Sequence, residues 1–150
     1  LMCADAEASW WPRNESGARM DARREPRERG RLLTTSEPDC LFCKIVAGEV
    51  PAEIVREGGS TVAFRDINPQ APTHVLVIPR DHYPDAGAAG RAGVGIMDEI
   101  AREAHEVAEA EGIAASGYRL VFNTGPGAGQ TVFHVHGHVL GGRGLEWPPG

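Results

Sequence analysis

The stretch TVFHVHGHVL, residues 131–140, decides both the fold and the site. Histidines alternate in it with mostly apolar residues at the period of a β-strand, so the pattern predicts a strand over residues 132–140. On such a strand His134, His136 and His138 would project from the same side, each about 6–7 Å from the next. Each buried imidazole left unpaired would cost about 1–3 kcal/mol, so three together indicate a functional site.

Two kinds of chemistry use histidines at this spacing. Neutral imidazoles can share a catalytic metal, or they can serve phosphate chemistry as nucleophile and donors. Residues 117–145 hold no carboxylate that could act as a metal ligand or base. Asn123, Thr131 and the amides of the glycine-rich loop 125–129 can instead donate hydrogen bonds to an anion. The composition of this region therefore favours phosphate.

Periodicity and turn residues predict the remaining elements. Two segments have helical spacing: a short one that ends at Gly48 and a long amphipathic one between Gly93 and Gly112. Strands are predicted where apolar residues run between turn signals, with Gly58-Gly59-Ser60 joining the first two as a hairpin. With the strand over residues 132–140, we expect strands at residues 53–57, 61–66, 74–78 and 118–122. This is an α+β domain with a five-stranded, largely antiparallel sheet, one long helix and one short helix.

Length and charge set the limits of the domain. The chain has 150 residues and a formal net charge of -6. Residues 1–36 are rich in Arg, Glu, Ser, Gly and Pro and have no apolar face, so we expect a disordered N-terminal extension followed by one domain over residues 37–150. The acidic domain argues against nucleic acid as a partner, and no apolar run is long enough to cross a membrane. Three cysteines and the lack of an export signal predict a cytoplasmic protein.

Residues 134–140 resemble the histidine triad (HIT) signature, His-x-His-x-His-x-x with hydrophobic x. Over residues 38–150 the chain looks like the Hint branch of that family, the purine nucleoside phosphoramidases. The similar motifs are CLFCKI at 40–45, GEVP at 48–51, FRDINPQAPTHVLVIP at 64–79, Asn123 with GQT at 129–131, and GGRGLEWPPG at 141–150.

The resemblance implies hydrolysis of purine nucleoside phosphoramidates, such as adenosine 5'-phosphoramidate and aminoacyl-AMP, without a catalytic cofactor. By motif position His136 is the nucleophile that becomes nucleotidylated, and His134 takes part in its proton relay. His138 and Asn123 bind the α-phosphate oxygens, and Thr131 donates to phosphate or to the leaving nitrogen. A dinucleoside polyphosphate hydrolase and a nucleotide-binding regulatory protein with incidental turnover are the alternatives.

The family pattern also marks a nucleoside pocket for an AMP-type purine nucleotide. Asp66 matches the position that holds the ribose hydroxyls, and His74 either supports the cleft or makes a structural hydrogen bond. The apolar wall around the base matches Phe42, Ile45, Phe64, Ile67 and Leu76, of which Ile45 and Leu76 could equally be core. The substrate-binding set is completed by Gly129, Gln130 and Trp147.

Some bacterial HIT proteins bind a structural zinc ion, and the matching positions here are Cys40, Cys43, His82 and His134. Two thiolates and two imidazoles make a closed tetrahedral set. The alternative is a pair of buried free thiols.

The Hint resemblance further implies a homodimer with one continuous ten-stranded sheet, in which the C-terminal tail reaches the partner's active site. The chain departs from the family at Gly137, where a bulky hydrophobic residue is usual, and at Pro126 in the glycine loop. Glycine at position 137 either admits a helix closely or loosens the dimer.

Overall fold

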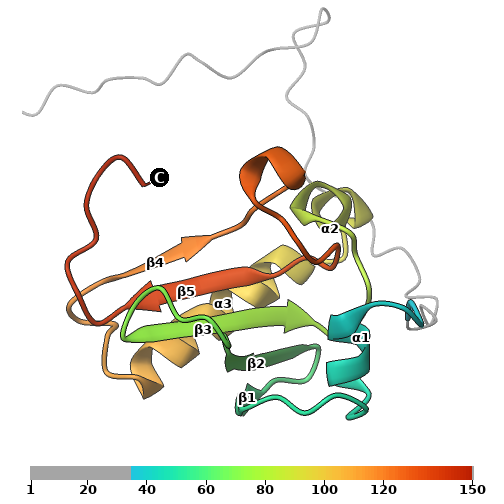
Figure 1. The fold of residues 1–150 in the computed structure, drawn as a ribbon, viewed down its shortest axis with the longest axis horizontal. Coiled ribbons are helices and arrows are strands. Elements are labelled where there is room, and N and C mark those ends of the chain that lie inside the picture. The colour runs from blue at the N-terminus through green and yellow to red at the C-terminus, as the bar shows by residue number, and fades with distance from the viewer. Residues whose placement is uncertain (1–34, 150) are drawn as a thin grey trace, which may run out of the picture. The chain divides into compact units, whose positions relative to one another are not determined.

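The computed structural model describes residues 35–149, and within them the sheet has the predicted five strands (Figure 1). No helix in this part of the chain has the length and apolar character needed to cross a bilayer. The predicted extension lies outside the described residues except for Thr35 and Ser36. The elements in order are α1 (Leu41–Val46), β1 (Ile54–Glu57), β2 (Thr61–Arg65), β3 (Thr73–Pro79), α2 (Ala86–Ala92), α3 (Ile96–Ala110), β4 (Tyr118–Val121), a 3₁₀ turn (Pro126–Ala128) and β5 (Gly137–Gly141).

The sheet has the order β1-β2-β3-β5-β4, and every neighbouring pair is antiparallel. This confirms the predicted class. All seven residues of the central strand β3 are buried, as expected for a continuous apolar run covered on both faces. The long helix α3 covers one face and packs on Val75, Val77 and Val139, and the short helix α1 packs on the other through Phe42.

One helix was not predicted. Helix α2 follows Asp85, whose carboxylate accepts a hydrogen bond from the Ala88 N–H at 2.8 Å, and it ends at Gly93 in the left-handed region. These are ordinary start and stop signals. Gly87 and Gly90 lie inside the helix and lower its intrinsic propensity, so the apolar pattern gave no sign of it.

The predicted strand over residues 132–140 was wrong in its first half, because β5 begins only at Gly137. In the register of the sheet, Val77 lies opposite Gly137, so Pro79 would lie opposite Val135 if the ladder continued. Proline has no N–H to donate to a ladder. The Val135 N–H instead donates to the carbonyl of Tyr83 at 2.6 Å, and residues 131–136 are irregular.

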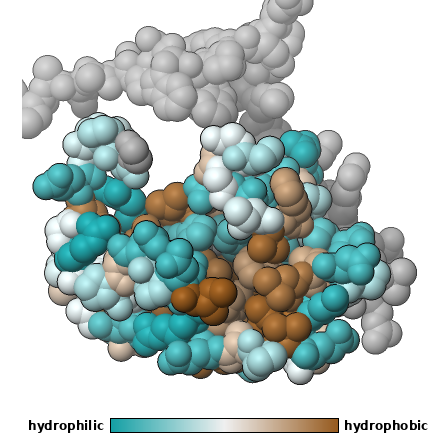
Figure 2. Space-filling view, in the orientation of Figure 1, coloured by the Kyte–Doolittle hydropathy of each residue, from teal (hydrophilic) through white to brown (hydrophobic). Residues whose placement is uncertain are grey.

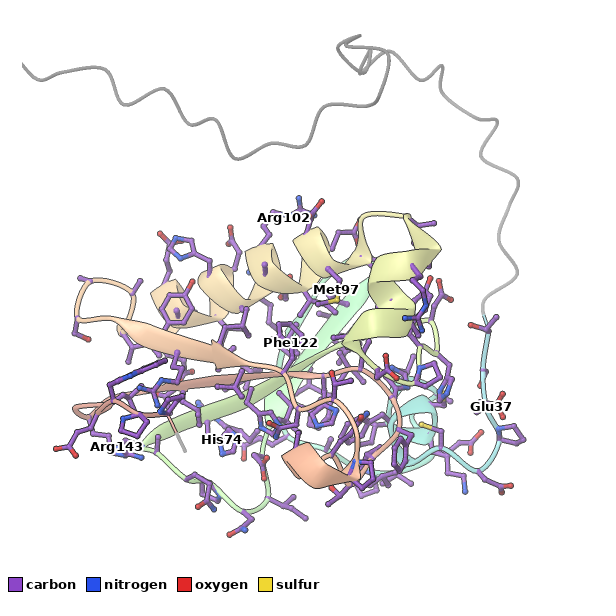
Figure 3. All side chains as sticks on the ribbon, turned by 90° about the horizontal axis from the view of Figure 1, so that it is seen from above. Glu37, His74, Met97, Arg102, Phe122 and Arg143 are labelled. Carbon is purple, nitrogen blue, oxygen red and sulfur yellow. The ribbon has the colours of Figure 1, made fainter. Side chains whose placement is uncertain are left out.

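Gly137 has a packing reason. A Cβ built at this position would lie 2.9 Å from Leu120 Cδ1, 3.2 Å from Phe122 Cζ and 3.3 Å from Ile100 Cγ2. Figure 3 shows Phe122 between the sheet and α3. The missing side chain therefore allows helix α3 to approach the sheet closely, one of the two explanations expected from the sequence.

Candidate active site

A cleft of about 440 Å³ lies on the face of the sheet away from α3. In Figure 2 hydrophobic surface gathers on this face. Phe42, Phe64 and Leu76 are buried core residues that also line the cleft. Ile67 is fully exposed at the rim. The structure brings to this cleft nine of the residues expected on the substrate: Phe42, Ile45, Phe64, Asp66, Ile67, Leu76, Thr131, His136 and His138.

The imidazole of His136 is held by a hydrogen bond to the backbone carbonyl of His134. Its Nδ1 lies 2.7 Å from the carbonyl oxygen of His134, which can only accept a hydrogen bond, so Nδ1 carries the proton. Phe42 packs against the ring edge-to-face with centroids 5.2 Å apart. The Nε2 atom has no hydrogen-bond partner among the described residues and keeps its lone pair. His136 therefore presents a basic, nucleophilic nitrogen in the cleft.

His138 carries its proton on the other ring nitrogen, Nε2, because of its contact with His74. The backbone N–H of Gln70 donates to His74 Nδ1 at 3.1 Å, which leaves the His74 proton on Nε2. That Nε2 lies 2.9 Å from His138 Nδ1 and 3.4 Å from an Asp66 carboxylate oxygen, both acceptors. His138 therefore carries its own proton on Nε2, an enclosed atom without a hydrogen-bond partner in the described part of the chain.

Burial keeps the imidazoles of His138 and His74 neutral. It lowers the pKa of His138 to about 4, and the adjacent His136 and His74 add to the effect because a charged His138 would repel their charged forms. Burial also lowers the pKa of His74, although Asp66 acts in the opposite direction. The centroids of His136 and His138 are 4.9 Å apart. The cleft thus contains an acceptor nitrogen on His136 beside a neutral donor on His138, a suitable pair for attack on phosphorus.

His134 does not line the cleft, although Phe42 packs edge-to-face on its ring as well as on that of His136, with centroids 5.9 Å and 5.2 Å apart. It is fully buried, and its Nε2 donates to the Pro79 carbonyl at 2.9 Å. Its Nδ1 faces the sulfur atoms of Cys40 at 3.5 Å and Cys43 at 3.6 Å. Burial lowers the pKa of His134 to about 4, so this imidazole is a neutral ligand near neutral pH.

Cys40, Cys43, His82 and His134 place one possible ligand atom each within 4.8 Å of one another. With zinc bonds of about 2.3 Å to sulfur and 2.0–2.1 Å to nitrogen, tetrahedral geometry requires a sulfur-to-nitrogen distance of about 3.6 Å. The Cys43 Sγ to His82 Nδ1 distance of 3.5 Å also meets this value. The residues fit a zinc ion, with Pro79 orienting His134 from behind as ligand histidines usually require.

The remaining residues expected on the substrate do not line the cleft: Asn123, Gly129, Gln130 and Trp147. The Gln130 side chain is buried and makes hydrogen bonds within the protein. Its oxygen accepts from the Gly125 N–H at 2.8 Å, and its nitrogen donates to the carbonyls of Pro84 and Val132. Trp147 is 85% exposed.

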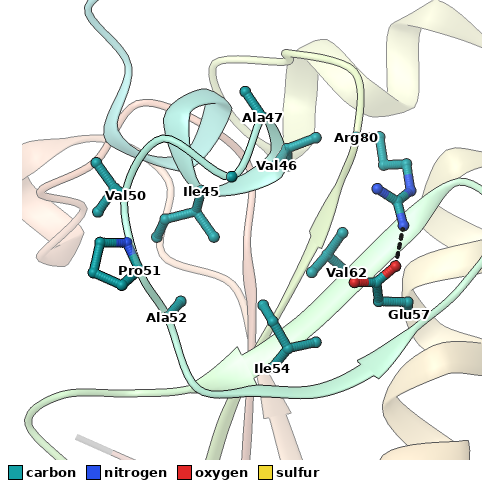
Figure 4. A pocket seen from close by; sticks show the side chains of 11 residues that line it. Ile45, Val46, Ala47, Val50, Pro51, Ala52, Ile54, Glu57, Val62 and Arg80 are labelled. Atoms are coloured by element: carbon teal, nitrogen blue, oxygen red, sulfur yellow. Dashed lines mark hydrogen bonds and ion pairs between the residues drawn. The ribbon is translucent and has the colours of Figure 1, made fainter.

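A second hollow of about 330 Å³ adjoins the apolar side of the cleft (Figure 4). The wall between the two hollows is made by Ile45, Val50, Pro51 and Ala52, which line both. An ion pair between Arg80 and Glu57, 3.3 Å apart, lies at its edge. This hollow contains none of the cleft histidines.

An antiparallel α+β domain with a donor–acceptor histidine pair beside an apolar cleft has the features of a site for a small ligand that is part apolar and part polar. The HIT domain profile matches residues 47–145, and the chain belongs to the HIT family.

The relatives agree with this assignment. The chain is 40% identical to adenylylsulfatase HINT1 of Arabidopsis thaliana, over 83% of this chain and 85% of that protein. It is 45% identical to a 14 kDa zinc-binding protein of Zea mays, over 79% of this chain and 94% of that one. A crystal structure of a HIT family hydrolase from Legionella pneumophila matches with a TM-score of 0.72 and 49% identity, over 75% of this chain and all of that one. Together these similarities indicate a nucleotide hydrolase.

Proposed function

We propose that this protein hydrolyses purine nucleoside phosphoramidates through a nucleotidylated His136. The carrying observation is the complementary pair in the cleft: the His134 carbonyl leaves His136 Nε2 unprotonated, and His74 leaves a proton on His138 Nε2. The apolar lining beside them suits a purine, and Asp66 offers acceptors for ribose hydroxyls.

In the first step, His136 Nε2 attacks phosphorus and forms a new P–N bond. The bond to the leaving amine breaks, its electron pair goes to the departing nitrogen, and that nitrogen takes a proton from solvent. The Nε2–H of His138 donates to a phosphoryl oxygen as negative charge develops there. Water then attacks phosphorus and forms a P–O bond while the bond from phosphorus to His136 Nε2 breaks. The electron pair of that bond returns to Nε2, the water loses a proton to solvent, and the nucleoside monophosphate leaves.

The test compares adenosine 5'-phosphoramidate, adenylyl sulfate, diadenosine tetraphosphate and AMP with the wild-type protein and His136→Ala. We expect the phosphoramidate to be cleaved fastest and the variant to be inactive. Adenylyl sulfate is included because the Arabidopsis relative is named an adenylylsulfatase, and faster turnover of it would establish that second candidate. Tight AMP binding without turnover would establish a regulatory protein, and phosphoramidase activity that survives His136→Ala would exclude the nucleophile.

The proposal includes a structural zinc ion at Cys40, Cys43, His82 and His134. The thiol and imidazole distances support it, as does similarity to a protein named for zinc binding. When bound, the ion would join helix α1 to the segments around His82 and His134, and the four ligands leave it no open position for substrate. We place the protein in the cytoplasm, where such thiols stay reduced.

We also propose a homodimer joined through β4. This strand lies at one edge of the sheet, and edge strands offer unpaired backbone groups to a second chain. A dimer would give exposed Trp147 a route to the partner's cleft. Sedimentation velocity at micromolar concentration tests the dimer, and a single monomeric species would exclude it.

A further inference from the structure

A third hollow, of about 470 Å³, adjoins the cleft. We name it the Phe133 groove, after its most exposed large hydrophobic residue. The groove is lined by Glu37, Asp39, Cys40, Leu41, His82, Pro84, Thr131, Val132 and Phe133, so two of the proposed zinc ligands lie in its wall. Leu41, Thr131 and Val132 line both the groove and the cleft. The groove and the cleft therefore meet along one shared rim.

The cleft lies between two hollows that share different walls with it. Ile45 belongs to the wall on the base side, whereas Thr131 belongs to the rim on the side of the groove. A substrate with its purine against the apolar wall and its phosphorus at His136 and His138 fills the cleft between them. In that pose a group attached beyond the phosphorus would reach the groove across the Thr131 rim.

The groove has an apolar floor and an acidic mouth. Phe133 is 52% exposed and Leu41 is 45% exposed, unusual values for large apolar side chains next to a polar site. Glu37 and Asp39 add two carboxylates, and the groove lining within residues 35–149 contains no lysine or arginine. An occupant with an apolar stem and a positive end complements both features.

The backbone that carries the two carboxylates is fixed to the domain. The N–H of Cys40 donates to the Glu37 carbonyl at 3.0 Å, and the Glu37 N–H donates to Cys43 Sγ at 3.4 Å. The Thr35 hydroxyl donates to the His82 carbonyl, and the Thr35 backbone carbonyl accepts from the His82 N–H. Figure 3 shows Glu37 on the segment that leads into α1. These hydrogen bonds therefore fix the backbone position of the two acidic residues at the mouth of the groove.

We infer that the Phe133 groove is the subsite for the leaving amine, and that it selects amines with an aliphatic or aromatic stem and a second positive charge. This inference rests on the proposed phosphoramidase function. The groove would bind the leaving amine, whereas the cleft would bind the nucleotide, and both sites lie within this chain.

The experiment uses the full chain and four adenosine 5'-phosphoramidates. Their leaving groups are ammonia, hexylamine, 1,6-diaminohexane and 6-aminohexanoate, which differ in stem and terminal charge. We expect kcat/KM to be about threefold to tenfold higher for the diamine than for the amino acid, the effect that two partly exposed charges produce. The preference should shrink in 0.5 M salt because of screening.

Two variants locate the selectivity. Glu37→Gln with Asp39→Asn should bring the diamine to 6-aminohexanoate ratio close to one, and comparison within each variant cancels any general loss of activity. Phe133→Ala should reduce the preference for hexylamine over ammonia by about threefold to tenfold. The matched control, Glu49→Gln with Asp98→Asn, removes two exposed acids outside the groove and should keep the wild-type ratios.

The outcomes separate this inference from the proposed function. Cleavage of all four substrates with equal kcat/KM would refute the groove and leave the phosphoramidase intact. If the control variant, Glu49→Gln with Asp98→Asn, loses the preference for the diamine to the same extent, the inference is also refuted. The preference would then come from the net charge of the protein and not from the groove. Failure to cleave any of the four would refute the phosphoramidase itself.

Discussion

Replacement of His74 by leucine tests the donor–acceptor arrangement of the cleft directly. In the wild-type protein the His74 ring receives one hydrogen bond, from the Gln70 N–H at 3.1 Å, and donates one to His138 Nδ1 at 2.9 Å. Leucine removes both. His138 Nδ1 then loses its donor in an enclosed site, and the proton on its Nε2 is no longer fixed where a phosphoryl oxygen needs it.

The size of the effect follows from the two bonds lost. A buried polar atom left unpaired costs about 1–3 kcal/mol, and an active-site donor that is removed outright costs about 100- to 1000-fold in kcat. The His138 donor is misdirected in the variant, not removed, so we expect kcat/KM to fall about 10- to 100-fold. The free energy of unfolding should fall by about 1–3 kcal/mol.

The assay is steady-state cleavage of adenosine 5'-phosphoramidate, run beside urea unfolding and ¹⁵N spectra of the histidine rings. His74→Gln is the control, because its amide oxygen can accept from Gln70 and its amide nitrogen can donate to His138. Glutamine should recover at least about tenfold of the lost kcat/KM. Wild-type activity in the leucine variant, or an unchanged proton on His138 Nε2 in its spectra, would refute the reasoning.

Three further predictions concern stability and the metal. Gly137→Val places a side chain 2.9 Å or less from Leu120 and should cost about 1–3 kcal/mol in urea unfolding, whereas Gly144→Ala, in open space, should cost under about 0.5 kcal/mol; equal costs would contradict the packing explanation. Because burial lowers the His138 pKa to about 4 against about 6.5 when unfolded, the unfolded chain binds the proton first as the pH falls. Stability should therefore drop by up to about 3 kcal/mol between pH 6.5 and 4, and His138→Asn should lose that contribution; the same slope in both proteins would refute it. Cys43→Ser should hold less than about half a zinc per chain by elemental analysis and unfold at a lower temperature, and full zinc retention would exclude the cysteine as a ligand.

Most of the fold could be predicted because its signals are local. Alternating apolar residues, the Gly58-Gly59 turn and the amphipathic spacing of α3 placed four of the five strands and the long helix within a few residues. Helix α2 escaped because its two glycines weaken the pattern. The early start predicted for β5 failed for a reason outside the strand: Pro79, far away in the sequence, ends the ladder on the neighbouring strand.

The site was less predictable, since pocket walls and core have the same composition. Leu76 serves as both, and no property of its local sequence separates the two roles. The role of His74 was also open, because its partners come from Gln70 and from β5, and only the sheet register brings His74 opposite Leu140 and near His138. Such contacts depend on tertiary structure and not on spacing along the chain.

The three histidines of the signature differ in what they contact through one and the same ring atom. Nδ1 of His134 faces two thiols, Nδ1 of His136 donates to a carbonyl, and Nδ1 of His138 accepts from His74. These contacts determine the state of each Nε2: one bonded to Pro79, one bare and one protonated. A repeated sequence element therefore yields three different chemical groups because the surrounding fold anchors each ring differently. The carbonyl that fixes His136 belongs to His134, so the cysteine cluster and the His136 ring are joined through a single residue.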